Sequence, residues 1–470
     1  MVVFTPTVGE LEKKYISKHP KSKQLYERAL NCYASGVSHD GRFARPFPIY
    51  AVRAEGTRKW DIDGNEYVDY VMGHGALLFG YGDERIHAAL QNQLPKAIHM
   101  GSCTELEIEW AELIQKLVPC ARGGLVRATS CGGEAVQMAL RLARIYTGRD
   151  KVVLHAGAYH GKGDTTIIVR RGPPFGMCNV RGIPQGVRDD VIIVPYNNLP
   201  AVEKAFTTGE VACILLQGNA LYSREYIKGL RELTSHYGVV FIMDEVVSGF
   251  RYAAGGAQEY YGVTPDLTAI GKIIGGGSPV GAVCGEREIM EFHAFKDAYW
   301  NRFVRIGVGG TWNAQPVSVI GGIAMMKIID AERDRIYPRL YEIGRRLTKS
   351  FNDQAEDLGL AALAFGLPVE TPTTLSINLF NRPIPSDKMY LWQTGPATFE
   401  DYTTKTGLAV GGQANYATYL TMINSGIFSY TGRGGSLCTK YTEEDLQKTE
   451  DAFGRTLRVL KENKLVGRVK

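Results

Sequence analysis

The chain has 470 residues, a length that suggests two or three domains or one large domain with an appendage. Hydrophobic residues make up 44% and charged residues 22%, and 54 Lys and Arg against 49 Asp and Glu leave a net charge of +5. This balance is typical of a globular protein and gives no support for a partner such as a nucleic acid or a membrane surface. We also expect no signal peptide and no membrane span, because the longest apolar run is short and contains Lys327.

The eight cysteines lie far apart, and no CxxC or other zinc-binding spacing occurs among them. We therefore expect no metal site. Cys213 and Cys284 stand in apolar runs that are typical of buried strands. The pattern favours reduced structural thiols in a cytoplasmic protein.

The first 35 residues have helical spacing. Residues 47–53 and 59–71 alternate, and Asp63-Gly64 splits the second segment as a hairpin signal. From about residue 72 to 329, apolar runs alternate with helical patterns. Strands are predicted at 151–157, 190–196, 211–217, 238–245, 267–271 and 281–285. Continuous apolar runs of this kind indicate strands that are covered on both faces, as in a largely parallel sheet.

Helices are predicted at 133–146, where apolar residues recur on one face, and at 443–462 near the C-terminus. We expect residues 72–329 to form a large α/β domain. Residues 1–71 and 330–470 are expected to pack together as a small α+β domain.

Two residues at predicted strand ends carry the clearest chemical signal. Lys272 follows the strand at 267–271 and precedes three glycines, and Asp244 lies at the end of the strand at 238–245. A carboxylate at the carboxyl edge of a parallel sheet points into the crevice where ligands bind. The pair suits pyridoxal phosphate, whose aldehyde a lysine holds as a Schiff base while a carboxylate keeps the pyridine nitrogen protonated. A solvated lysine before a turn and a helix N-cap are the alternatives.

Two further segments fit such a cofactor. Gly132 and Gly133 open the predicted helix at 133–146, and the N–H groups at a helix start suit a phosphate. Tyr159 follows the strand at 151–157, where an aromatic ring can stack on a flat cofactor. Taken singly, the glycine pair is a weak signal, because two glycines before a helix often make a tight turn. A core or surface tyrosine is the better explanation of Tyr159 taken alone.

Together these motifs resemble the class III, fold-type I, pyridoxal-phosphate-dependent aminotransferases, and above all their glutamate-1-semialdehyde aminomutase-like group. The resemblance extends from about residue 20 to 462 and rests on the segments SCGGEAVQMALRLAR, IMDEVVSGFR, DLTAIGKIIGGGSPVGA and GGTWNAQP. It implies an α/β fold with a mostly parallel, seven-stranded-type sheet in the large domain. It also implies pyridoxal 5'-phosphate as cofactor and a homodimer with shared active sites.

The resemblance assigns a role to each matching residue. Lys272 is the Schiff-base lysine and proton shuttle, and Asp244 pairs with the pyridine nitrogen. It also implies that Gly132 and Gly133 bind the cofactor phosphate, and that Tyr159 and Val246 lie against the two faces of the cofactor ring. Thr311 would contact the phosphate of the cofactor in the neighbouring subunit. Cys131 stands where the family often has a serine.

Four positions are candidates for the substrate side. Arg42 falls where relatives bind a substrate carboxylate, and a guanidinium suits a carboxylate or a phosphonate. His74 borders the substrate in relatives. A surface arginine and a structural histidine are the alternatives. Arg433 stands where a semialdehyde aminomutase is expected to have an acidic residue, which argues against that substrate.

Gln217 replaces a glutamate that in many relatives pairs with an arginine while a neutral amine is bound. An uncharged amide cannot form this ion pair. The substitution therefore predicts an enzyme that does not switch between a neutral ω-amine and 2-oxoglutarate. The alternative is that Gln217 hydrogen-bonds the backbone behind the cofactor.

The leading interpretation is an aminotransferase acting on a small amine or amino acid that bears an acidic group. An aminomutase, a racemase, or an ammonia-lyase that eliminates from a substrate such as an aminophosphonate would share the first chemical step. A non-catalytic cofactor-binding homologue is a different class of function. A nucleotide-binding protein is disfavoured, because no GxGxxG or P-loop follows the first strand.

Overall fold

The computed structural model of the chain describes residues 5–168, 181–381 and 411–468, and these form two compact units. The described part of unit 1 comprises residues up to Asp83, Pro338–Asn381 and 411–468, and that of unit 2 lies within Glu84–Tyr337. The long helix α14 (Pro316–Asp357) runs from one unit into the other. Among the described helices, none combines the length and the apolar character that a bilayer span requires.

Unit 2 is built on a seven-stranded sheet with the order β4-β10-β9-β8-β7-β5-β6. The strands are β4 (Leu125–Thr129), β5 (Lys151–His155), β6 (Val191–Val194), β7 (Val211–Gln217), β8 (Val240–Glu245), β9 (Leu267–Gly271) and β10 (Gly281–Gly285). The four pairings from β9 to β6 are parallel, and β10 is antiparallel to both of its neighbours. The predicted α/β class with a mostly parallel sheet is confirmed.

Six of these seven strands are the predicted ones. β4 was not predicted from the sequence, because LVRAT is short, carries Arg127 at its centre and is only partly buried. The apolar runs of the other strands are buried as expected, and Cys213 and Cys284 are fully buried. Cys178 lies outside the described residues.

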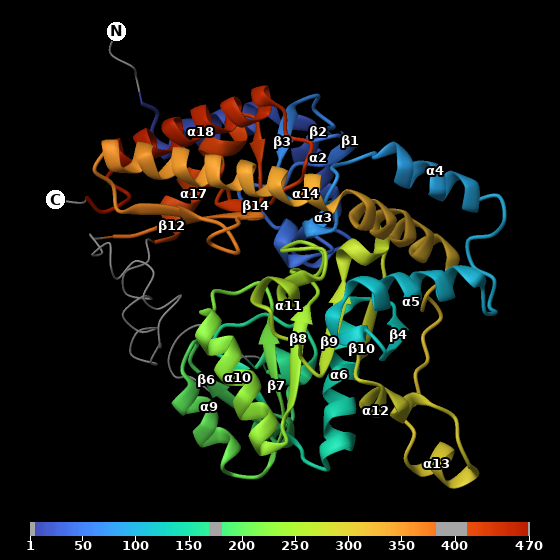
Figure 1. The fold of residues 1–470 in the computed structure, drawn as a ribbon. Helices are drawn as coiled ribbons and strands as arrows, with labels where there is room; N and C mark the ends of the chain where they lie inside the picture. The colour runs from blue at the N-terminus through green and yellow to red at the C-terminus, as the bar shows by residue number, and fades with distance from the viewer. Residues whose placement is uncertain (1–4, 169–180, 382–410, 469–470) are drawn as a thin grey trace. The chain divides into compact units, whose positions relative to one another are not determined.

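Helix α6 (Gly132–Thr147) packs on one face of the sheet, as Figure 1 shows. Every second residue of the central strands meets it, for example Cys213 and Leu215 on β7 and Val240 and Ile242 on β8. This alternation is the side-chain period of a strand. The other helices of unit 2 are α4 (Glu84–Gln93), α5 (Glu105–Leu117), α7 (Asp164–Ile167), α8 (Gln185–Asp189), α9 (Leu199–Phe206), α10 (Arg224–Tyr237), α11 (Gly256–Tyr261), α12 (Arg287–Met290) and α13 (Ala298–Phe303), with short 3-10 turns η3 (Pro119–Ala121), η4 (Lys272–Gly275) and η5 (Glu291–His293).

Unit 1 contains two small sheets. One has the order β1-β2-β3-β13, and the other has the order β11-β12-β14. The strands are β1 (Ala51–Glu55), β2 (Arg58–Asp61), β3 (Glu66–Asp69), β11 (Ala362–Phe365), β12 (Thr374–Leu379), β13 (Ile427–Phe428) and β14 (Gly434–Ser436). β2 and β3 form the hairpin predicted at Asp63-Gly64, and Gly64 has the positive φ of 88° that such a turn needs. β1 begins four residues later than the predicted segment at 47–53.

The helices of unit 1 come from both ends of the chain. They are α1 (Val8–Lys18), α2 (Pro20–Ala29), α3 (Met72–Gly75), α17 (Gly412–Asn424) and α18 (Glu443–Glu462), with the 3-10 turns η1 (Ala34–Gly36) and η2 (Asp40–Arg42). α18 has the predicted bounds, and a capping box at Thr442 fixes its start. α17 packs against both α1 and α18, so N-terminal and C-terminal segments share one core.

Candidate cofactor site and anion pocket

Lys272 directly follows β9 in unit 2, at the carboxyl end of the parallel strands. Its backbone has a φ of 53°, in the left-handed region that side-chain-bearing residues seldom adopt. Gly271 and Gly276 flank this turn, and a Cβ on Gly276 would lie 2.3 Å from the Gly321 carbonyl oxygen. The chain therefore turns sharply at the lysine, in the manner of residues that are held at functional sites.

The Lys272 amine is a poorly solvated group. Burial lowers its pKa below the ordinary value, Asp244 opposes this shift, and Arg251 adds to it. Within the described parts of the chain, the amine forms no hydrogen bond and no ion pair. A partly buried amine with a lowered pKa and no partner in the described structure is suited to act as a nucleophile and base.

Asp244 lies on β8, is 5% exposed, and uses both carboxylate oxygens. Oδ2 is 2.8 Å from Nδ1 of the buried His160, and Oδ1 accepts a hydrogen bond from the Val246 N–H at 3.1 Å. Each oxygen keeps a further lone pair for another donor. No role was predicted for His160 from the sequence, although it follows Tyr159 directly and a buried carboxylate requires a donor.

Near Lys272 and Asp244, several glycines lie in close contact with neighbouring segments of the chain. A Cβ on Gly132 would lie 2.5 Å from Cγ2 of Val246, and one on Gly271 would lie 3.3 Å from the Gly132 Cα. A Cβ on Gly161 would lie 3.4 Å from the Gly133 Cα. The start of α6, the turn after β8, the end of β9 and the loop after β5 are thus brought together.

The start of α6 is suited to a phosphate. Its N-cap residue, Cys131, gives no side-chain hydrogen bond to the helix. The first N–H groups of a helix have no partner within it, and the helix dipole makes this end positive. A helix start without a side-chain cap, the residues Lys272 and Asp244, and closely packed glycines together fit pyridoxal phosphate.

Tyr159 and Gln217 are also joined at this edge of the sheet. Oε1 of Gln217, the last residue of β7, accepts a hydrogen bond of 2.6 Å from the Tyr159 N–H. Its Nε2 donates to Oδ1 of Asn219 at 3.1 Å. These bonds agree with the alternative interpretation of Gln217, in which its amide holds the backbone. They do not support its assignment to substrate binding.

Thr311 is exposed, and its carbonyl oxygen lies 2.5 Å from Nε2 of His99. In the part of unit 2 that is described, no hydrogen bond links the Thr311 side chain to Lys272 or Asp244. The structure therefore does not join Thr311 to the other cofactor residues of the same chain. His, Cys, Asp and Glu side chains of the described residues form no group of three or more that could hold a metal ion.

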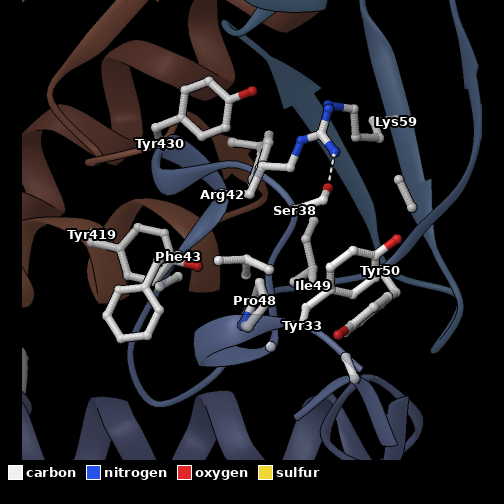
Figure 2. A pocket seen from close by; sticks show the side chains of 17 residues that line it. Tyr33, Ser38, Arg42, Phe43, Pro48, Ile49, Tyr50, Lys59, Tyr419 and Tyr430 are labelled. Carbon is white, nitrogen blue, oxygen red and sulfur yellow. Dashed lines mark hydrogen bonds between the residues drawn. The ribbon is translucent and has the colours of Figure 1, made fainter. Parts of the chain in front are cut away.

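Arg42 lies in unit 1 and lines a pocket of about 370 Å³, shown in Figure 2. Its Nη1 donates to Oγ of Ser38 at 3.0 Å, and it lies beside Tyr430, a second lining residue. Burial raises the pKa of the Tyr430 hydroxyl to about 12, and the Arg42 guanidinium opposes this shift. Over the described ranges, Arg42 forms no ion pair with a carboxylate.

The rest of the pocket wall is largely apolar and includes six aromatic residues, and none of the lining residues given for it is acidic. They are Ala29, Tyr33, Gly36, Val37, Ser38, Gly41, Arg42, Phe43, Ala44, Pro48, Ile49, Tyr50, Ala51, Lys59, Tyr419, Phe428 and Tyr430. Lys59 forms an ion pair of 3.0 Å with the buried Asp69, so its charge is already balanced. Arg42 is the cation of this wall that is available to an anion.

His74 has a positive φ of 59°, and its ring hydrogen-bonds the Tyr430 hydroxyl. It is connected to the pocket through Tyr430 and is not one of the lining residues given above. Arg433 is not among them either, and its carbonyl oxygen accepts a hydrogen bond from the Ile377 N–H. The structure thus brings Arg42 and His74 together through Tyr430, and it places Arg433 at the β12–β14 sheet.

Comparisons with known proteins agree with this architecture. The aminotransferase class-III family profile matches residues 41–360. The chain is 32% identical to a glutamate-1-semialdehyde 2,1-aminomutase of Methanosphaera stadtmanae, over 93% of this chain and 98% of the relative. It is 38% identical to the Archaeoglobus fulgidus protein of the same name, over 72% of this chain and 81% of the relative.

Among solved structures, an omega-transaminase from Sphaerobacter thermophilus is 31% identical, with a TM-score of 0.80 over 93% of this chain and 97% of that one. A structure described as a transaminase with PLP bound is 27% identical, with a TM-score of 0.80 over 95% and 99% of the two chains. The family profile matches more than half of the chain, and relatives above 30% identity match it over nearly their whole length. The chain belongs to the class-III aminotransferase family.

Proposed function

We propose that the chain is a pyridoxal-phosphate enzyme that rearranges or eliminates the amino group of a small substrate bearing an acidic group, without a second substrate. Pyridoxal 5'-phosphate is the cofactor predicted for this chain, and membership of the class-III family confirms it. Single-substrate chemistry was an alternative in the sequence analysis. It is supported by relatives that are named 2,1-aminomutases.

The lack of a charge at Gln217 carries the proposal. A two-substrate enzyme of the switching type needs a carboxylate here that pairs with an arginine when a neutral amine is bound. Gln217 has no charge, and both ends of its amide are bound to Tyr159 and Asn219. The chain therefore has no acidic switch residue at this position.

The acidic group of the substrate is assigned to Arg42. An exposed guanidinium in a pocket, without a carboxylate partner among the described residues, is a site for an anion. The Tyr430 and Ser38 hydroxyls lie beside it as further polar contacts.

Residues of unit 2 would hold the cofactor and move the proton. When bound, the cofactor withdraws electrons from the carbon that carries the amine, so a proton on that carbon becomes removable. Lys272 would hold the cofactor, and its amine, whose pKa burial lowers, would take up and return that proton. Asp244 would keep the ring nitrogen protonated, the start of α6 would bind the phosphate, and Tyr159 and Val246 would enclose the ring. Thr311 would serve the partner subunit of a homodimer.

Two-substrate transamination is the second candidate, and the likeness to an omega-transaminase favours it. The two can be separated by incubating the holoenzyme with small amines that bear a carboxylate or a phosphonate, with no keto acid present. We expect one of them to give product far beyond one equivalent per active site. Product that stops at one equivalent until a keto acid is added would establish transamination. A holoenzyme whose visible spectrum responds to none of these amines would favour a non-catalytic homologue.

A further inference from the structure

The loop after β5 places Tyr159, and the ring of this residue has little support of its own. Tyr159 is 55% exposed, and in the described structure its ring stacks on no other aromatic residue. Its position therefore depends on how the backbone of the loop is held. A ring that must cover a flat cofactor needs a fixed position, because stacking is effective only over a short range.

Two neighbouring strands hold this loop at consecutive residues. Gln217 at the end of β7 binds the Tyr159 N–H at 2.6 Å, and Asp244 on β8 binds the His160 ring at 2.8 Å. Gln217 and Asp244 are themselves partners in the parallel pairing of the two strands. The loop is thus fixed from two adjacent points at the edge of the sheet.

The Gln217 end of this arrangement has little freedom to move. The Gly218 N–H donates to the Asp244 carbonyl oxygen at 2.8 Å, and a Cβ on Gly218 would lie 2.2 Å from Oγ of Ser248. The Gln217 amide is also oriented, because its Nε2 donates to Asn219 and so its oxygen faces Tyr159. A rigid strand end therefore presents one oriented acceptor to the loop.

We propose that Gln217 is a positioning residue of the cofactor site, which holds Tyr159 over the cofactor ring and does not contact the substrate. The proposal rests on the cofactor site and not on which reaction the enzyme catalyses. It also predicts which replacements the position would tolerate. A glutamate can still accept from the Tyr159 N–H, whereas a leucine of similar size cannot, and would leave that N–H without its partner.

The test compares Gln217→Leu and Gln217→Glu with the wild-type holoenzyme. Two measurements do not depend on turnover: hydrogen exchange of the peptide that contains residues 156–163, and the rate of cofactor loss after dilution. We expect Gln217→Leu to exchange faster in that peptide and to lose the cofactor about tenfold faster, as the loss of one hydrogen bond implies. Gln217→Glu should stay within about twofold of wild type. Gln447→Leu on α18 is a matched control.

A double substitution tests the link to the ring. In a Tyr159→Leu background, Gln217→Leu should accelerate cofactor loss far less than it does alone. The reason is that Gln217 acts on cofactor binding through the contact of the Tyr159 ring with the cofactor, which this background lacks. At saturating cofactor, KM for the substrate should stay within about twofold in Gln217→Leu. Unchanged exchange and cofactor loss in Gln217→Leu, additive effects in the double variant, or a raised KM with normal cofactor retention would overturn the proposal.

Discussion

Nδ1 of His160 lies 2.8 Å from Oδ2 of Asp244, and both side chains are buried. The imidazole therefore supplies one of the two hydrogen bonds that satisfy the carboxylate assigned to the ring nitrogen of the cofactor. Removing it would leave the buried carboxylate with one hydrogen-bond donor fewer and therefore less firmly held in place. Asp244 would then hold the proton of the ring nitrogen less firmly.

We therefore expect His160→Leu to retain the cofactor but to lower kcat about ten- to a hundredfold, the range of a hydrogen bond to a charged group. His160→Gln, which keeps a donor, should recover part of the loss. The pH titration of the visible spectrum of the holoenzyme should shift in His160→Leu and less in His160→Gln. A purely structural role for His160 predicts no spectral shift in either variant.

Lys272→Ala should lower turnover by at least about a thousandfold, because it removes the base that moves the proton. The far-UV circular dichroism and the unfolding curve should stay close to wild type, since the Lys272 amine has no partner in the described structure. Lys228→Ala, on the exposed face of α10, serves as the control. Turnover within a few-fold of wild type would assign the base to another group.

Arg42→Ala should raise KM for substrates with an acidic group far more than for neutral amines. The loss of a hydrogen-bonded charge contact to an anion costs about 2–5 kcal/mol. Arg42→Lys keeps the charge but not the planar fork, so an intermediate KM is expected. Steady-state kinetics on matched pairs of amines, with and without the acid, measure this difference. Equal effects on both members of each pair would contradict an anion site at Arg42.

Because His155 is buried, we expect the free energy of unfolding of the protein to fall in acid. Burial lowers its pKa to about 3, with a smaller contribution from His160, so the folded protein keeps this ring neutral. Between about pH 6.5 and pH 3 the unfolded chain binds a proton that the folded chain does not, so the free energy of unfolding falls as the pH falls. From pH 6.5 to pH 5 this amounts to about 2 kcal/mol for one group.

Urea unfolding of His155→Phe at pH 7 and pH 5 measures this effect. The substitution also removes the 2.6 Å contact of Nε2 with the Tyr226 hydroxyl, so the difference between the two pH values is the informative quantity. That difference should be smaller in His155→Phe than in wild type. In a His236→Phe control at an exposed position it should be unchanged. The same pH difference in all three proteins would show that His155 does not carry the acid sensitivity.

The sequence by itself determined the α/β class, the family and its cofactor, because these follow from patterns that are local in the chain. Continuous apolar runs mark strands covered on both faces, and six strands of the large sheet lie where such runs occur. β4 was missed because Arg127 interrupts its apolar pattern, and its pairing with β10 depends on a strand more than 150 residues away.

Only the tertiary structure decided which groups meet. Gln217 and Asp244 are 27 positions apart in the sequence (244 − 217), yet strand register makes them neighbours. From there they bind the consecutive residues Tyr159 and His160. Sequence analysis can place a residue at a strand end, but a hydrogen bond requires two atoms within about 3 Å, and that separation is set by strand order and register. For this reason the sequence left two interpretations of Gln217 open, and its hydrogen bonds favour one of them.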